Sequence, residues 1–559
     1  MRTKTIRLLI VAALLQLAAL PVSRSQQINP RFMDQSWTAR WISCPGAPDH
    51  EFSVQRFRKH FDLRAAPAHF VVHASGDNRY ELFVNGKRVV EGPARGDLFH
   101  WRFETLDIAS QLHAGSNTLA AVVWNFGDRA PMAQMTNQTG FILQGDTDDD
   151  VSTGNSWSCA LDSSVSMLPP PPALQYTYIV VGPGERVDGS KFPWGWETSG
   201  FDDSKWQRAQ SIVAGAPRGA RDSHSRWMFV PRNIPLMESH LQRMARIVYS
   251  KGTTSALPLP VGSGAPGTSS KKEERLRRFM NSIKSQGIMP PNDFLEGHSP
   301  FTVAPHTEVT HIADQSFLTT AYPELIVSGG RGAEITLTYA EAPVKEREKG
   351  NRNDIDGKTI QGFQDVFLPD GGAHRLFRPL WWRTYRYVQI DVKTQDDPLT
   401  LEDFRGQFTA YPFVRRAQFE SDDPELSKMW EVGWRTARLC AHETYMDCPY
   451  YEQLQYAGDT RIQALISLYM TGDDRLVKNA VQLLDDSRTP DGLTQSRYPS
   501  YLPQYIPPFS LLWIGMMHDL WWYRGDADFL RRFLPGQRDV LGWFESRLSH
   551  SGLLGKLEW

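Results

Sequence analysis

The sequence predicts a multidomain β + α chain, in which an N-terminal jelly-roll β-sandwich, a second β-sandwich and the first helices of an α/α toroid follow one another. Three observations predict it. The chain has 559 residues, more than one hydrophobic core usually supports. Runs rich in β-branched and aromatic residues recur up to about residue 413. After Asp423-Pro424 the apolar residues take up a helical spacing instead.

The N-terminal residues have the pattern of a secretory signal peptide, which we assign to 1–25. Arg2, Lys4 and Arg7 precede an apolar run over 8–22, and small residues follow it. No later apolar run reaches the roughly 20 residues that span a bilayer. We therefore expect an exported protein, in the bacterial periplasm or outside the cell, that does not insert into a membrane.

Residues 28–215 have the signals of the N-terminal sandwich. The runs 70–74, 80–84 and 119–124 are rich in β-branched and aromatic residues. Asn85-Gly86 directly after the second run is a strong signal for a two-residue hairpin turn. A jelly roll of this kind often binds carbohydrate, and packing against a neighbouring domain is an equally good interpretation.

The next two segments are predicted to be a linker and the second sandwich. Residues 216–300 include a stretch rich in Gly, Ser, Pro and Lys, and we assign them to a linker and a surface insertion. In 301–415 the period of two returns, most clearly over 334–339 and 385–392. These residues form the predicted second β-sandwich.

Residues 421–559 are predicted to be helical. Asp423-Pro424 is a good N-cap and first-turn pair. Further helices are expected near 460–470, 474–484, 508–523 and 527–548. Similar phrases end in Gly472-Asp473 and Gly525-Asp526, 53 residues apart. A helix-hairpin repeat of this length suits an α/α toroid.

Composition and spacing exclude several classes of function. The 61 basic and 63 acidic residues leave a net charge of −2, so neither nucleic acid nor an anionic membrane is indicated as a partner. The four cysteines are too few and too scattered for a disulfide scaffold. Neither a CxxC or HExxH spacing nor a Gly-rich phosphate loop is present. We expect no cofactor; structural Ca²⁺ at the acidic residues 146–150 stays open, with a solvated loop favoured.

The stretch DCPYYEQLQYAGD, which begins at Asp447, combines three carboxylates with three tyrosines. Pro449 breaks any continuous helix, so a new helix is expected just after it. In that helix Glu452, Tyr456 and Asp459 are spaced i, i+4 and i+7 and would share one face. Aromatic rings pack on the apolar face of a sugar, carboxylates accept hydrogen bonds from its hydroxyls, and a carboxylic acid can protonate a glycosidic oxygen.

Glu452 is the best candidate for that acid, because the neighbouring tyrosines would desolvate its carboxyl group and favour the protonated form. Asp447 and Asp459 would bind hydroxyls. Seven helical residues place the Cα atoms of Glu452 and Asp459 roughly 10 Å apart, too far for an inverting acid–base pair, so the base is expected elsewhere. Arg497 and Trp513 are secondary candidates for sugar contact. The structural alternative is a helix-capping Asp447, a solvated Glu452 and core tyrosines.

The same stretch resembles the active-site signature of glycoside hydrolase family 78, the inverting α-L-rhamnosidases. By this resemblance Glu452 matches the general acid of the family, and Asp447 and Asp459 match acidic residues that bind the rhamnose hydroxyls. Tyr456 stands where many members have Trp in a W-x-G-D pattern, and it still offers a stacking surface.

The resemblance extends over most of the chain through looser landmarks, such as Trp41-Ile42-Ser43 and Asn85-Gly86-Lys87 in the N-terminal module. It implies an (α/α)₆ catalytic barrel over 421–559, yet about five helices are expected where a toroid of six hairpins needs about twelve. The general base of the family is a glutamate far downstream of the acid. We therefore expect a C-terminally truncated chain that lacks the base and is poorly active or inactive alone.

The predicted function is exo-acting, inverting hydrolysis of terminal α-L-rhamnose from glycans or glycosides, with a carbohydrate substrate as the partner and the oligomeric state left open. Two alternatives stay open. One is a non-catalytic carbohydrate-binding protein in which Glu452 is incidental. The other is a different glycosidase, or a polysaccharide lyase, on an α/α toroid.

Overall fold

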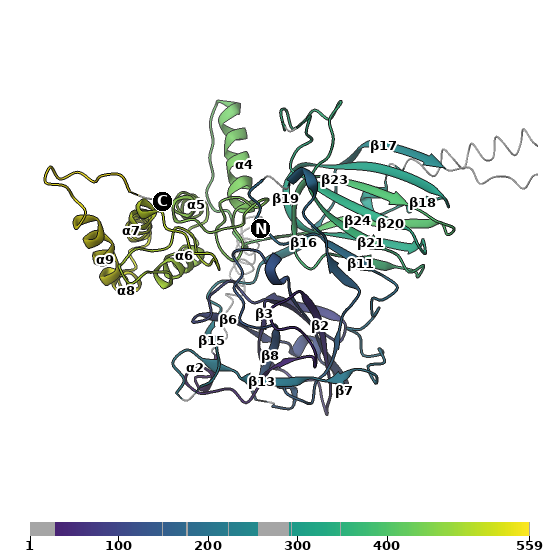
Figure 1. Cartoon of the computed structure of the whole chain (residues 1–559), viewed down its shortest axis with the longest axis horizontal. Coiled ribbons are helices and arrows are strands. Elements are labelled where there is room, and N and C mark those ends of the chain that lie inside the picture. Colours follow the sequence, from purple (N-terminus) through teal and green to yellow (C-terminus); the bar gives the residue numbers. More distant parts are fainter. Residues whose placement is uncertain are drawn as a thin grey trace, which may run out of the picture.

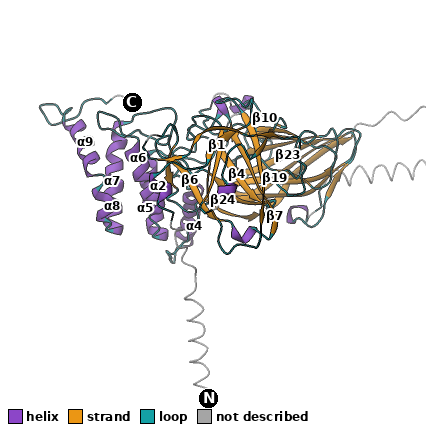
Figure 2. Cartoon of the chain, turned by 90° about the horizontal axis from the view of Figure 1, so that it is seen from below, coloured by secondary structure: helices purple, strands orange, loops and turns teal. Residues whose placement is uncertain are grey.

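The computed structural model describes residues 28–147, 149–174, 177–221, 223–254, 290–291, 293–346 and 348–557. The predicted signal peptide and much of the predicted linker lie outside these residues. The described residues form an N-terminal sandwich, one large β-sheet beside it, and a helical region next to both (Figure 1). Figure 2 shows the helices gathered at one end of the molecule and the strands at the other. The predicted fold class is thus confirmed.

The N-terminal sandwich consists of two sheets, with a core of side chains such as Phe57, Leu82 and Phe141 between them. The first has the order β13 (Gln210–Ala214), β1 (Arg40–Ser43), β8 (Gly140–Gly145), β3 (Val71–Asp77), β6 (Trp101–Asp107), β15 (Met228–Pro231) and β14 (Ala216–Pro217). The second has the order β12 (Gln207–Arg208), β9 (Ser158–Leu161), β2 (Ser53–Leu63), β7 (Gly115–Asn125), β4 (Arg79–Val84) and β5 (Lys87–Gly92). Short helix α2 (Arg31–Asp34) precedes them.

The large sheet has eleven strands. Its main path is β10 (Val165–Met167), β11 (Glu185–Asp188), β21 (Phe363–Leu368), β20 (Glu334–Ala340), β23 (Arg383–Lys393), β19 (Thr307–Gly329), β24 (Leu399–Ala410) and β16 (Glu238–Gln242), with β17 (Arg246–Thr254), β18 (Phe301–Val303) and β22 (Arg375–Phe377) paired beside it. β19 pairs with β17 and β23 in its first half and with β24 and β22 in its second. Its register shifts between Asp314 and Thr319, so one long strand joins both halves of the sheet.

The linker predicted for 216–300 is corrected over residues 216–254. Residues 216–254 contain strands of both β units: β15 pairs with β6 of the sandwich, whereas β16 and β17 pair with β24 and β19 of the large sheet. The Gly- and Ser-rich composition that suggested a linker belongs to 255–289, which lie outside the described residues.

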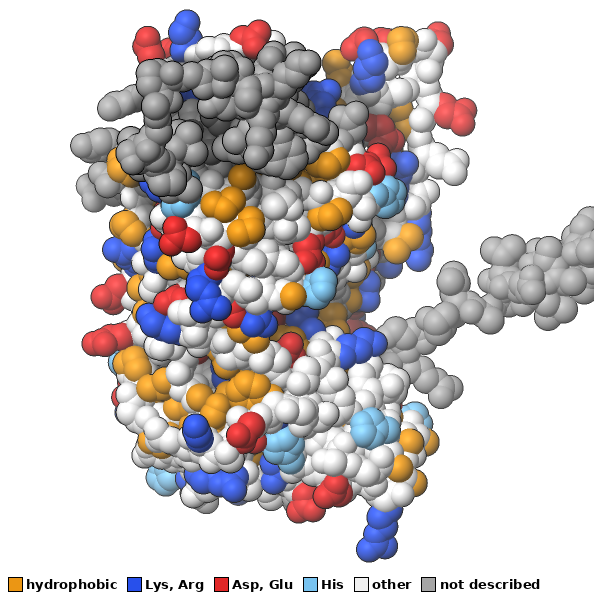
Figure 3. Space-filling view, turned by 90° about the vertical axis from the view of Figure 1, so that its right-hand side faces the viewer, with side chains coloured by type: hydrophobic (Ala, Val, Ile, Leu, Met, Phe, Trp, Pro, Cys, Tyr) orange, Lys and Arg blue, Asp and Glu red, His pale blue; other side chains and the backbone are white. Residues whose placement is uncertain are grey.

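The helical region contains α4 (Pro424–Leu439), α5 (Ala457–Thr471), α6 (Arg475–Asp486), α7 (Pro507–Arg524), α8 (Ala527–Arg531) and α9 (Leu534–Glu545). Asp423 caps α4 as predicted, because its side chain accepts the N–H of Glu425. The single helix expected over 527–548 is divided into α8 and α9. None of the described helices combines the length and the apolar composition that a membrane span needs. On the face turned away from the helices, acidic and basic side chains are interspersed (Figure 3).

Candidate active site

The segment 447–456, here called the acidic turn, is not helical. The backbone N–H and one carboxylate oxygen of Asp447 bond to the C=O and N–H of Leu454, at 2.8 and 3.0 Å. Gln453 takes a left-handed conformation with φ of 58°. These bonds close a loop, and α5 begins only at Ala457. The predicted helix face shared by Glu452, Tyr456 and Asp459 is therefore wrong, because side-chain hydrogen bonds compete with the helix here.

Residues of the large sheet hold the acidic turn in place through buried hydrogen bonds. Thr384 donates to the carbonyl of Pro449 at 2.8 Å, and the hydroxyl of Tyr450 donates to the carbonyl of Tyr339 at 2.8 Å. The indole N–H of Trp381 donates to the side-chain oxygen of Gln453 at 3.1 Å. All three bonds are shielded from water, so the sheet is a rigid base for the turn.

Two carboxyl groups meet at the surface of the turn. Asp447, Cys448 and Glu452 each place a side-chain ligand atom within 4.8 Å of the others. Burial, reinforced by the negative charge of Glu452, raises the pKa of Asp447 to about 7. Asp447 therefore retains its proton up to about neutral pH.

Tyr456 connects this pair to Arg497. The tyrosine is the N-cap residue of α5, and its hydroxyl donates to Oε2 of Glu452 at 3.1 Å. Nη1 of Arg497 donates to the hydroxyls of Tyr456 and Tyr178, at 2.6 and 2.8 Å. Arg497 is buried, and burial raises the pKa of the Tyr456 hydroxyl. The predicted residues Asp447, Glu452, Tyr456 and Arg497 thus form one contiguous polar cluster.

The other two predicted site residues form no hydrogen bond or ion pair with this cluster within the part of the chain that the structure describes. Asp459 is exposed in the first turn of α5, where a carboxylate favours the helix dipole, and no hydrogen bond or ion pair between described residues joins it to Glu452. Trp513 is fully buried in the core of the helical region, and its indole donates to the carbonyl of Val481 at 3.0 Å. The prediction that Trp513 binds substrate is therefore corrected: a ring without exposed surface packs the core.

Sequence patterns did not single out three further residues of this region. Tyr178, in the segment before β11, bonds to Arg497, and Arg95, in the loop after β5, bonds to the carbonyl of Gln453 in the acidic turn. Lys349 lies 4.8 Å from the ring of Tyr451, at the end of an ion pair with Glu341. Only for Lys349 was there a signal, because it belongs to a long polar loop beside a predicted sheet.

Among the described residues two clusters have the residue types of a metal site. Burial raises the pKa of Cys448 to about 11, so its thiol stays protonated beside Asp447 and Glu452. In the second cluster His100 bonds to Asp97 at 3.0 Å and lies 3.4 Å from Asp486, but Arg218 donates to its other ring nitrogen. The guanidinium occupies the position that a cation would need. All four cysteines are free.

Comparisons with known proteins identify two family domains in this chain. The profile of the bacterial α-L-rhamnosidase six-hairpin glycosidase domain matches residues 415–558, and that of the α-L-rhamnosidase N-terminal domain matches 65–220. A search of curated proteins found no match.

Solved structures show the same fold at low sequence identity. A glycoside hydrolase family 78 rhamnosidase of Bacillus sp. GL1 is 18% identical, with a TM-score of 0.76 over 94% of this chain and 71% of that one. An α-L-rhamnosidase from Dictyoglumus thermophilum is 18% identical (TM-score 0.66; 94% and 53%). One from Streptomyces avermitilis, complexed with L-rhamnose, is 17% identical (TM-score 0.62; 89% and 42%). The chain thus spans 42 to 71% of the length of these relatives.

Proposed function

The chain belongs to the α-L-rhamnosidases of glycoside hydrolase family 78, and on this premise we propose that it acts on terminal α-L-rhamnose through the acidic turn. One observation carries the proposal: at the position of the family signature, Asp447 and Glu452 place carboxylate oxygens within 4.8 Å of one another, and Glu452 accepts a hydrogen bond from the Tyr456 hydroxyl. The substrate would be a glycan or glycoside that ends in α-L-rhamnose, and the protein would act on it outside the cytoplasm.

Glu452 is the proposed proton donor to the leaving oxygen. Tyr456 donates a hydrogen bond to Oε2 of Glu452, so the negative charge that develops as the proton leaves is stabilised where it forms. Arg497 donates in turn to the Tyr456 hydroxyl and makes it a stronger donor. The tyrosine and the arginine orient the acid, and Arg497 does not need to touch the sugar.

Asp447 is proposed to bind a sugar hydroxyl. Its carboxyl group lies too close to Glu452 for the two to flank an attacking water, since the carboxyl groups of an inverting pair are about 6.5 to 9.5 Å apart. A pKa of about 7 also makes it a poor nucleophile, because it is largely protonated below neutral pH. Asp459 is proposed to bind a second hydroxyl. The base for an inverting reaction is not assigned to a described residue.

The proposal is tested with two aryl or alkyl α-L-rhamnosides that differ in leaving group. Glu452→Gln should slow hydrolysis of methyl α-L-rhamnoside by about 10² to 10⁴-fold, and that of the 4-nitrophenyl glycoside much less, because an activated leaving group needs little protonation. Glu420→Gln, at an exposed carboxylate, is the matched control. Proton NMR of the first product reports the mechanism: β-L-rhamnose means inversion, and α-L-rhamnose contradicts it.

L-Rhamnose binding, followed by calorimetry, separates this proposal from its rival. Binding of L-rhamnose without hydrolysis of either glycoside fits both a non-catalytic carbohydrate-binding protein and a rhamnosidase whose base is not among the described residues. Added azide can replace a missing base, so azide-dependent cleavage of the 4-nitrophenyl glycoside supports the enzyme, and its absence supports the binding protein. If L-rhamnose does not bind and neither glycoside is cleaved, the assignment of the acidic turn fails. Asp447→Asn should weaken L-rhamnose binding about tenfold if its carboxyl group accepts a hydroxyl.

A further inference from the structure

The N-terminal sandwich reaches into the acidic turn through Arg95. This guanidinium is buried, with 5% of the residue exposed. Its Nη1 donates to the backbone carbonyl of Gln453 at 2.6 Å and to the hydroxyl of Thr444 at 3.2 Å, and its Nη2 lies 3.5 Å from the side-chain oxygen of Gln453. One side chain of the sandwich therefore bonds to the residue directly after Glu452.

Gln453 needs such support because of its backbone. Its φ of 58° lies in the left-handed region, which a residue with a Cβ rarely adopts without tertiary contacts that hold it. Its N–H donates to the carbonyl of Cys448 at 2.9 Å and its side-chain amide donates to that of Pro449 at 3.0 Å. This conformation reverses the chain between Glu452 and Leu454, so it sets the direction in which Glu452 projects.

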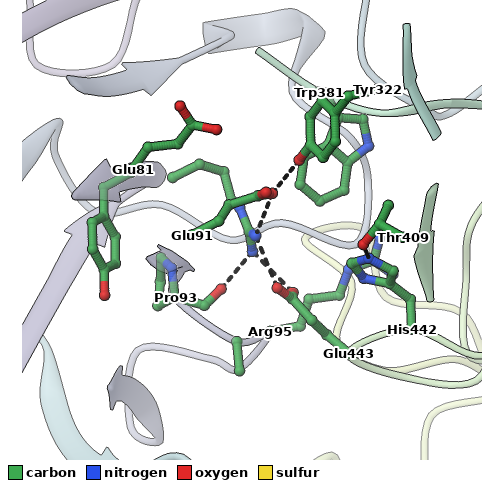
Figure 4. Close-up of polar contacts among 12 residues, drawn as sticks. Glu81, Glu91, Pro93, Arg95, Tyr322, Trp381, Thr409, His442 and Glu443 are labelled. Atoms are coloured by element: carbon green, nitrogen blue, oxygen red, sulfur yellow. Dashed lines mark hydrogen bonds and ion pairs between the residues drawn. The ribbon is translucent and has the colours of Figure 1, made fainter. Parts of the chain in front are cut away.

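Stability alone does not explain a cation at this position. Within the described residues the hydrogen bonds of Arg95 go to neutral oxygens, and burial lowers its pKa to about 10 although the nearby charge of Glu443 favours the protonated form. The neighbouring Arg79, by contrast, forms a buried two-pronged ion pair with Glu443, at 2.8 and 2.9 Å. Figure 4 shows Arg95 beside Glu443, where the sandwich meets the loop that leads into the acidic turn. A charge that is unfavourable to bury and is aimed at a strained backbone has the features of a functional residue.

We infer that Arg95 is a positioning residue of the active site: by holding the carbonyl of Gln453 it fixes the orientation of Glu452, which makes the N-terminal sandwich a structural component of the active site. The role of Glu452 in this inference rests on the proposed function. The hold on the turn does not, and the two can be tested separately.

Hydrogen–deuterium exchange of the whole chain tests the hold on the turn. Arg95→Met should speed exchange in peptides covering 447–456 about tenfold, because the amides of Gln453 and Leu454 bond to acceptors within the turn that Arg95 holds. Arg102→Met is the matched control: Arg102 is another buried arginine of the sandwich, with 6% exposed, and it donates to the carbonyl of Pro231 at 3.1 Å. Unchanged exchange in the turn, or an equal change in both variants, overturns the inference.

A second pair of variants keeps the test open if Arg95→Met does not fold. Arg95→Lys retains the positive charge and one donor group but loses the forked guanidinium that bonds to two acceptors at once. An intermediate increase in exchange is therefore expected. Gln453→Gly removes the strain at positive φ, and the effect of Arg95→Lys on exchange should be smaller in that background. Effects of the two substitutions that simply add would show that Arg95 does not act through Gln453.

The functional readout is L-rhamnose affinity together with turnover. Arg95→Met should lower kcat/KM by about 10²-fold while the melting temperature stays near or above that of the parent. A parallel decrease in kcat/KM and in melting temperature would assign Arg95 a merely structural role and contradict the inference. If the parent itself neither binds nor cleaves rhamnosides, the proposed function fails, and the exchange experiment still decides whether Arg95 holds the turn.

Discussion

The N-terminal sandwich and the helical region differ in where their large apolar side chains lie. In the sandwich the apolar residues of the strands fill closed cores between and beside the two sheets. The helical region shares its core with the β units through residues such as Ala94, Ile234 and Tyr411. Its outer helix faces carry exposed apolar residues, namely Leu426, Met429, Val432, Ile462, Tyr469, Trp521, Trp522 and Leu541. The helical region therefore depends on its contacts with the sheets more than the sandwich depends on the helices.

The buried ion pair of Arg79 and Glu443 is the contact whose loss should have the largest effect. Its two side chains are each 2% exposed, so removing one partner leaves an uncompensated buried charge. We expect Arg79→Met to destabilise the protein by about 3 to 5 kcal/mol. Calorimetry should show the helical region unfolding in a separate, earlier transition, which would sharpen the contrast between the two regions.

The double variant Arg79→Met with Glu443→Leu is the control for that prediction, because it removes both charges together. It should recover much of the lost stability. If both variants unfold in one transition at the parental temperature, this ion pair does not stabilise the helical region. The proposed difference between the helical region and the sandwich would then lose its main support.

The next effect concerns pH and separates two acids of the helical region that lie four residues apart. Glu443 has its pKa lowered to about 2, chiefly by Arg79 against the effect of burial, so its stabilisation is present above about pH 4.5 and lost toward pH 2. Asp447 has its pKa raised to about 7, so the folded state binds the proton more tightly than the unfolded state does. Its stabilising contribution is complete below about pH 4 and is lost as the pH rises through 7.

Asp447→Asn should abolish that loss. Between pH 5 and 7 the variant is expected to gain roughly 2 to 3 kcal/mol over the parent, because one pKa unit corresponds to about 1.4 kcal/mol. Urea denaturation at pH 5 and pH 7 measures the gain. Equal pH dependence in variant and parent would mean that Asp447 has an ordinary proton affinity. If the variant is more stable but binds L-rhamnose more weakly, the carboxyl group of Asp447 lowers the stability of the fold in exchange for sugar binding.

Trp513 tests the core of the helical region. Trp513→Phe removes the indole N–H and its buried hydrogen bond to the carbonyl of Val481, which should cost about 1 to 2 kcal/mol. L-Rhamnose affinity should not change, because the ring is buried. Tyr456→Phe provides the opposite pattern, with a small stability change and a loss of turnover. A change of sugar affinity in Trp513→Phe would restore the substrate-binding role that the structure does not support.

Local sequence signals predicted the helices, strands and turns well, whereas tertiary contacts determine the conformation of the active-site segment. Asn85-Gly86 makes the expected hairpin turn, with φ of 50° and 82°, and Gly472 and Gly525 end α5 and α7 in left-handed conformations. The residues of the acidic turn were also found from sequence. Its shape was not, because the bonds that hold it involve Arg95, which is 358 residues from Gln453 along the chain. Such contacts leave no periodic pattern in one sequence.

The smallest effect concerns the exposed apolar faces themselves. Trp522 is 73% exposed and Met429 65%, so replacing either by Ser should change the free energy of unfolding by no more than about 0.5 kcal/mol. The double variant should nevertheless bind less of a fluorescent dye that reports apolar surface, since these side chains supply that surface on the helices. Leu241→Ser, at a 50% exposed leucine of β16, is the control in the β units. An equal decrease in dye binding in the double variant and in Leu241→Ser would mean that the helical region and the β units expose apolar surface alike. The ion pair of Arg79 and Glu443 would then be the main remaining support for the contrast between them.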